Sequence, residues 1–324
     1  MTNLPSGTYD LLFYAHGSLD AETGNISLSV DGVDLGTRIT DVVLGWRNVS
    51  WQEGVHYVRF SGFPVSKGSE LVIRALPGPA GLAVINGMQL LRNAGCSPAP
   101  AGQVAWWRGE GDGSDALGGH DGTLENGLGF ADGIVGQAFA FSALGQHLLV
   151  PASPDFVTDS LTLETWINPD AARLGEQQPI FEFADESGPG GVHFWLSVLA
   201  GGGFESPGAL FANIRSITGE SYLLGTAPGL VAGDAWSHVA LTYDSGSGQG
   251  TLYLNGELVA EANLGSIAPN TRQNLYLGYR PLGSADGGGG YTFGGKIDEP
   301  GFYRRALSAA EIAAIHAAGS AGKC

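Results

Sequence analysis

A short acidic, glycine-rich stretch has the residue types of a calcium site. It runs from Glu110 to Asp115 and is followed closely by Asp121 and Gly122. Ca²⁺ takes several oxygen ligands and mixes carboxylates with backbone carbonyls, and glycine lets the backbone approach an ion closely. The spacing matches no EF-hand loop, so the alternative that these are solvated loop acids stays open.

Aromatic residues in the expected loops are candidates for sugar recognition. A sugar packs the apolar face of its ring on an aromatic side chain, while fixed polar groups bond its hydroxyls. For any one of these aromatics, local packing without a ligand explains its presence equally well. The candidate ligand-binding residues are Trp46, Trp51, Tyr222, Asn270, Tyr279, Arg280 and Tyr291.

Hydrolysis of a glycosidic bond requires two acids on one face, about 5–5.5 Å apart in a retaining enzyme. The nearest pattern begins at Glu182, but Ala184 stands where a second acid is needed. Glu164 is alone on its expected strand, and Asp298 and Glu299 point to opposite faces of theirs. The sequence therefore predicts a protein that is not an enzyme.

The composition indicates a folded protein with short strands and many turns. The chain has 324 residues, of which 53 are glycine and only 15% are charged, and long helices do not give this pattern. The net charge of −17 would repel a phosphate backbone, so we expect no nucleic acid partner. The sequence has no apolar run of about 18 residues, so we expect no membrane insertion.

Short apolar runs separated by turn residues predict an all-β protein with two β-sandwich domains. We expect a small jelly roll over residues 1–95 and a larger sandwich over residues 103–324. Residues 96–102 between them are small and Pro-rich, which predicts a linker.

Three local patterns predict where particular elements turn or begin. Asp31-Gly32 and Asn255-Gly256 favour tight hairpin turns, because both dipeptides tolerate the positive φ angles of a type I′ turn. Ser308 and Glu311 have the spacing of a capping box. We therefore expect one short helix near the C-terminus.

A series of motifs runs along residues 103–318. They are the opening Val104–Gly111, the loop Asp115–Thr123, the strands Gly136–Phe141 and Leu161–Pro169, the pair Trp236–Asp244 and Leu252–Val259, and the closing Gly295–Glu299 and Tyr303–Ile312. Together they resemble the laminin-G-like, concanavalin-A-like jelly rolls of large secreted bacterial proteins. Residues 1–95 are only loosely similar to galactose-binding-like jelly rolls.

The resemblance implies a secreted setting, in a longer chain, with the two ends of the larger domain side by side. Cys96 and Cys324 flank that domain, so we expect a disulfide between them, and its Cα atoms must lie within about 7 Å. Closing so long a loop stabilises a fold by roughly 4–5 kcal/mol in the chain-entropy model. The alternative is two free thiols.

The resemblance also implies a structural calcium ion between the first loop and the last strand. Its side-chain ligands would be Asp115 and Asp298, with Asp112 or Asp121 as further ligands. The alternative is that Asp298 is bound by backbone amides.

These expectations favour an extracellular, non-catalytic adhesion module that recognises a glycan or a surface protein. One alternative is a purely structural spacer in a large surface protein. Another is a degenerate or accessory domain of a glycoside hydrolase. The sequence names no sugar, because specificity depends on loop geometry that one sequence does not reveal.

Overall fold

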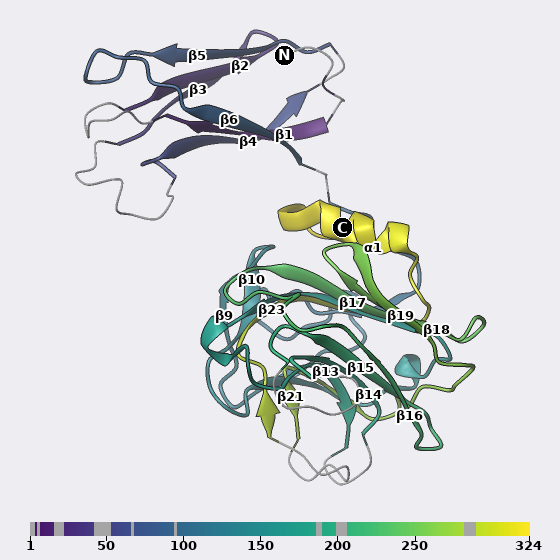
Figure 1. Ribbon diagram of the computed structural model, residues 1–324. Helices are drawn as coiled ribbons and strands as arrows, with labels where there is room; N and C mark the ends of the chain where they lie inside the picture. Colours follow the sequence, from purple (N-terminus) through teal and green to yellow (C-terminus); the bar gives the residue numbers. More distant parts are fainter. Residues whose placement is uncertain are drawn as a thin grey trace. The chain divides into compact units, whose positions relative to one another are not determined.

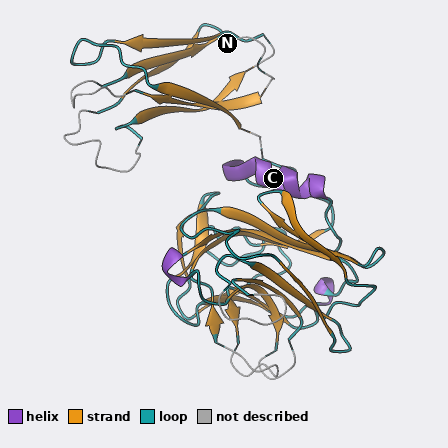
Figure 2. Cartoon of the chain, viewed as in Figure 1, coloured by secondary structure: helices purple, strands orange, loops and turns teal. Residues whose placement is uncertain are grey.

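The computed structural model describes residues 4, 7–15, 23–41, 53–65, 68–93, 96–185, 190–198, 206–281 and 290–324. The chain divides into two compact units, Met1–Gly95 and Cys96–Cys324. Strands dominate both units (Figures 1 and 2), which confirms the all-β prediction.

The smaller unit has two three-stranded antiparallel sheets, with strand orders β4-β1-β6 and β3-β2-β5. Leu11 and Phe13 of β1 are buried together with Ile26 and Leu28 of β2. This alternation is that of strands with one face on a core. The strands are β1 Gly7–Tyr14, β2 Asn25–Val30, β3 Val33–Ile39, β4 Tyr57–Val65, β5 Leu71–Leu76 and β6 Gly87–Asn93.

The larger unit contains an eight-stranded and a seven-stranded antiparallel sheet. The first has the order β19-β18-β17-β12-β23-β10-β9, with β7 also paired to β23, and the second has the order β16-β15-β14-β13-β20-β11-β8. The short hairpin β21–β22 forms a separate two-stranded sheet. The first strands are β7 Gln103–Trp106, β8 Thr123–Glu125, β9 Gly129–Asp132, β10 Gln137–Phe141, β11 His147–Val150, β12 Leu161–Pro169 and β13 Gln178–Ala184. The others are β14 Val192–Leu196, β15 Leu210–Arg215, β16 Ser221–Gly225, β17 Ser237–Asp244, β18 Gln249–Leu254, β19 Glu257–Asn263, β20 Asn274–Leu277, β21 Tyr279–Arg280, β22 Tyr291–Thr292 and β23 Gly295–Tyr303.

One apolar core joins the two sheets of the larger unit. Phe139 and Phe302 of the eight-stranded sheet and Phe181 and Phe194 of the seven-stranded sheet all belong to it and are fully buried. Because successive strand residues point to opposite faces, the residues between these positions lie on the outer faces of the sheets.

The local turn and cap patterns form as expected. Asp31-Gly32 and Asn255-Gly256 all have positive φ, and each pair connects two antiparallel strands. The Ser308 side chain accepts a hydrogen bond from the backbone N–H of Glu311, so a capping box starts helix α1, Ala309–Ala318. Its Ile312 packs with Ala240, Tyr253 and Tyr303 of the eight-stranded sheet, and helix α1 lies beside the strands of that sheet in Figure 1.

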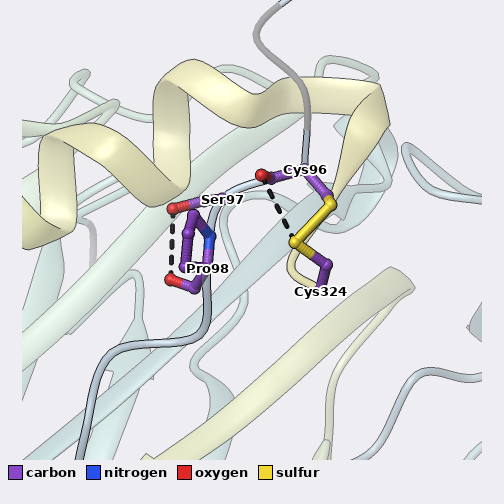
Figure 3. Close-up of a disulfide and its surroundings, with 4 residues drawn as sticks. All are labelled: Cys96, Ser97, Pro98 and Cys324. Carbon is purple, nitrogen blue, oxygen red and sulfur yellow. Dashed lines mark hydrogen bonds between the residues drawn. A yellow bond between two sulfur atoms is a disulfide. The ribbon is translucent and has the colours of Figure 1, made fainter.

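Residues 96–102, which we expected as a linker, belong to the larger unit, and Ser97 pairs with its C-terminal end. The backbone N–H of Ser97 donates to the carbonyl of Gly322, and that of Cys324 donates to the carbonyl of Ser97. Cys96 and Cys324 form the predicted disulfide, with Cα atoms 5.4 Å apart (Figure 3). The two ends of the unit are therefore joined covalently.

We expect the Cys96→Ser/Cys324→Ser variant to lose about 5 kcal/mol of unfolding free energy, because its unfolded chain is no longer closed into a long loop. Denaturant unfolding of the variant and the wild-type protein in oxidising buffer measures the difference. In reducing buffer the two proteins should unfold at the same denaturant concentration. A variant as stable as the oxidised wild type would contradict the stabilising role of the bond.

Candidate functional site

A row of side chains crosses the outer face of the seven-stranded sheet. Tyr276 of β20 lies opposite Glu182 of β13, and Glu182 lies opposite His193 of β14. The row continues through Asn213 of β15 to Leu223 of β16. Each residue alternates with apolar neighbours that point into the core. The sheet register thus brings four polar side chains from four strands together.

Glu182 is the centre of this row and is fully buried. Its Oε2 accepts a hydrogen bond of 2.7 Å from Nε1 of Trp195, and Nδ1 of His193 lies 2.7 Å from the same oxygen. The guanidinium of Arg280 is 3.5 Å from Oε1. A buried carboxylate requires such compensation, because removing its charge from water is costly.

The β21–β22 hairpin supplies the aromatic and cationic groups beside Trp195. The Tyr291 ring lies 5.3 Å from the Trp195 ring, and Arg280 lies over Trp195 at 5.5 Å. Gly278, between β20 and β21, has a φ of 75°, and a Cβ there would lie 2.1 Å from Phe141. Only glycine allows the hairpin to start so close to the core.

A second pair of aromatic rings lies at the base of the same hairpin. His147 of β11 stacks on Tyr279 of β21, with ring centroids 4.6 Å apart, and Tyr276 is 5.4 Å from His147. Burial lowers the pKa of His147 although its ring nitrogen bonds the carbonyl of Gly145, which favours the neutral ring. The site therefore combines apolar ring faces with polar groups held in fixed positions.

The predicted ligand-binding residues fall into three groups. Tyr279, Arg280 and Tyr291 come together on the β21–β22 hairpin. Tyr222 instead packs partly against the core, and Asn270 lies outside the row, with its carbonyl bound by the backbone of Val192. Trp46 and Trp51 lie outside the described residues.

His193 and Trp195 were not predicted from the sequence as residues of the site. Both alternate with the apolar Val192, Phe194 and Leu196, and that alternation places them on the outer face of a strand. The signal was present, but nothing in it paired them with Glu182.

The acids predicted to bind calcium are held mainly by backbone amides. Asp115 accepts hydrogen bonds from the N–H groups of Trp106, Leu117, Gly119 and His120. These bonds occupy both of its oxygens. Asp121 accepts from the N–H of Asp115, and Asp112 accepts from Ser114. These bonds organise the Asp112–Asp121 loop.

Asp298 differs from the other three acids. Its Oδ2 accepts hydrogen bonds from the N–H groups of Ile134 and Val135. Its Oδ1 is buried without a hydrogen-bond partner. Burial raises the pKa of Asp298 to about 7. In the part of the chain that the structure describes, no three His, Cys, Asp or Glu side chains gather as a metal site. A calcium ion at Asp298 would therefore depend on backbone carbonyls as well.

A second buried ionic cluster lies on the outer face of the eight-stranded sheet. Oε1 of Glu164 accepts from Lys323 at 2.6 Å and from the hydroxyl of Tyr303 at 3.2 Å, and Oε2 lies 3.1 Å from His238. Lys323 also donates to the backbone carbonyl of Glu299. Lys323, near the C-terminus, thus completes the cluster. We therefore assign these residues to the stability of the fold and not to ligand binding.

A sequence profile described as the concanavalin A-like lectin/glucanases superfamily matches residues 142–313, just over half of the chain. The binding domain of botulinum neurotoxin serotype D is similar in structure, with 13% identity and a TM-score of 0.50 over 66% of this chain and 51% of that one. This chain thus spans about half the length of the neurotoxin domain.

Domain 4 of AbnA, a GH43 extracellular arabinanase from Geobacillus stearothermophilus in complex with arabinotriose, has 21% identity and a TM-score of 0.48. The match covers 65% of this chain and 96% of that domain. No curated protein matches the sequence. Among the described residues, the structure has no helix of the length and apolarity that a membrane span needs.

We expect the stability of the larger unit to fall as the pH drops from about 4.5 to about 2. Burial opposes ionisation of Glu164, but the charge of Lys323 and the contact with His238 lower its pKa from 4.5 to about 2. The folded state thus holds fewer protons than the unfolded state in this range, and about 3 kcal/mol is lost on acidification. Chemical unfolding at several pH values measures the slope.

The Glu164→Leu/Lys323→Met double variant is the control for this pH dependence. It removes both buried charges and should show a flatter slope between those pH values. An unchanged slope would mean that other carboxylates cause the acid sensitivity.

We expect millimolar CaCl₂ to raise the melting temperature of EDTA-treated protein by about 5 °C, because an ion that binds only the folded state stabilises it. Asp298→Asn should abolish this rise, whereas Asp112→Asn at the exposed loop should retain it. Scanning calorimetry with MgCl₂ as the comparison checks the effect. A melting temperature unaffected by calcium would show that the predicted ion does not bind.

Proposed function

Because the chain belongs to the concanavalin A-like lectin/glucanase superfamily, we propose that its larger unit is a carbohydrate-binding module. The observation that carries the proposal is the group formed by Trp195, Tyr291, Arg280 and Glu182 on one sheet face. Sugar recognition requires an apolar ring face beside fixed polar groups. This group supplies both.

We propose further that the module is non-catalytic. Hydrolysis of a glycoside generally uses two carboxyl groups that face each other across the scissile bond. Glu182 has a histidine, a tryptophan and an arginine as its partners, and Ala184 takes the next outward position on its strand. Glu164 and Asp298 belong to the other sheet. A single buried carboxylate positions its neighbours and does not complete an acid–base pair.

The proposed setting is extracellular, within a longer protein that adheres to a glycan-bearing surface. The disulfide Cys96–Cys324 supports this setting, because such bonds persist in oxidising compartments. The net charge of −17 keeps the module away from anionic surfaces. A structural calcium ion at Asp298 remains part of the proposal.

We expect the wild-type protein to bind members of a glycan array, and Trp195→Ala and Arg280→Gln to reduce the affinity at least about tenfold, since both residues lie at the centre of the group. Trp236→Ala is the matched control, because Trp236 contacts Lys296 in the other sheet. Thermal melts check that each variant folds.

Two outcomes would contradict the proposal. Absence of binding to any glycan, with and without calcium, would favour the spacer alternative. Release of reducing ends from a polysaccharide, lost in Glu182→Gln, would show that the module is an enzyme.

A further inference from the structure

An open cavity of about 240 Å³ lies at one edge of the smaller unit. It is formed by β3 and β4, which are edge strands of the two sheets of that unit, and by the segment just before β4. Its volume is below the roughly 300–1,000 Å³ of pockets for drug-sized ligands, so it suits a ligand about the size of one sugar residue. The lining residues are Arg38, Ile39, Glu53, Gly54, Val58 and Arg59.

Arg38 reaches from one sheet toward the other at this edge. It lies directly opposite Ile26 of β2, which is fully buried in the core. Because directly opposite residues of an antiparallel pair project from the same face, Arg38 projects toward the opposite sheet. Its guanidinium lies 5.3 Å from the centre of the Phe60 ring on β4. The Arg38 side chain therefore spans the two edge strands.

The guanidinium of Arg38 is the unpaired cation of the cavity. It forms no hydrogen bond or ion pair with any residue that the structure describes. Arg59, in contrast, donates from both Nε and Nη2 to Asp10, so its charge is balanced. A guanidinium stays charged at every pH of interest, and its planar N–H groups match the two oxygens of a carboxylate. The cavity thus has one fixed charge that is free to bind an anion.

The lining is accessible to a ligand. Ile39 is 51% exposed and the side chain of Arg59 is 41% exposed, and Arg38 and Glu53 are also exposed. Within the described part of the unit, β3 pairs only with β2 and β4 only with β1. The free edges of both strands therefore offer backbone N–H and C=O groups. Hydroxyl groups can bond these, while Ile39 offers an apolar surface.

The charge of the chain is divided unevenly between the two units. Residues 1–95 contain eight acidic and six basic residues, a net charge of −2, whereas residues 96–324 contain 24 acidic and nine basic residues, a net charge of −15. The larger unit repels an acidic ligand, but the smaller unit does so only weakly. Glu53 adds a negative charge to the lining itself, so the cavity favours a single carboxylate over a densely charged polyanion.

We propose that this cavity is a second binding site, which takes a sugar residue that bears a carboxylate, that is, a uronic acid. The carboxylate binds the guanidinium of Arg38, the C–H face of the ring packs on Ile39, and the hydroxyls bond Glu53 and the free strand edges. The inference goes beyond the proposed function, which concerns the larger unit.

The test compares two probes of equal size by isothermal titration calorimetry on the full chain. They are trigalacturonate and its fully methyl-esterified form, which keeps the hydroxyls and loses the charges. We expect trigalacturonate to bind at least about tenfold more tightly, because a hydrogen bond between two charged groups is much stronger than one to a neutral ester. The difference should shrink as NaCl is added, since exposed charges are screened by salt.

Variants identify the site that binds the acidic probe. Arg38→Gln should weaken trigalacturonate binding about tenfold, and Glu53→Gln should strengthen it, because a negative charge leaves the lining. Arg74→Gln is the matched control. It makes the same change in charge on β5, the opposite edge of the sheet that contains β3, and should bind as the wild type does. Trp195→Ala, in the larger unit, should also retain trigalacturonate binding. Thermal melts check that each variant folds.

Three results would overturn the inference. They are equal affinity for the acid and its ester, wild-type affinity in Arg38→Gln, and an equal loss in Arg38→Gln and Arg74→Gln, which would reflect the overall charge of the unit. None of them bears on glycan binding by the larger unit, which Trp195→Ala tests separately.

Discussion

The burial of the Glu182 carboxyl group constrains the side chains around it on the outer face of the seven-stranded sheet. A carboxylate removed from water is tolerated only where donors and opposite charges surround it. Here they come from β14 through His193 and Trp195 and from the β21–β22 hairpin through Arg280. The ring of Trp195 contacts both Arg280 and Tyr291. The same interaction thus positions the aromatic and the polar parts of the site.

The eight-stranded sheet also has a buried carboxylate, that of Glu164, but its partners come from a different part of the chain. Glu164 is compensated by Lys323, which comes from the C-terminal end of the chain, and that end is held by the disulfide to Cys96. Helix α1 packs on the same face through Ile312. Glu164 is therefore paired with a residue near the C-terminus, and this pair stabilises the fold. The other carboxylate, that of Glu182, is compensated by His193, Trp195 and Arg280 on the seven-stranded sheet and its neighbouring hairpin.

Much of the fold was predictable because its signals are local. Alternating apolar residues identified the long central strands, and the dipeptides Asp31-Gly32 and Asn255-Gly256 identified their turns. The strands that the sequence did not reveal are short and lie mainly at sheet edges, such as β8, β9 and β16. Edge strands of three to five residues have too few positions to show a period of two. The resemblance led us to expect the two ends of the larger domain side by side and the disulfide Cys96–Cys324. The backbone pairing of Ser97 with the C-terminal residues was not expected of a linker.

For the candidate site, the sequence by itself indicated which side chains point outward from the strands it identified, and that Ala184 takes the next outward position after Glu182 on its own strand. It also placed Tyr279, Arg280 and Tyr291 in one segment of the chain. Only the tertiary structure decided that Glu182, His193, Asn213 and Tyr276 are neighbours. The physical reason is that alternation fixes the face of a residue, whereas strand order and register depend on contacts between distant segments.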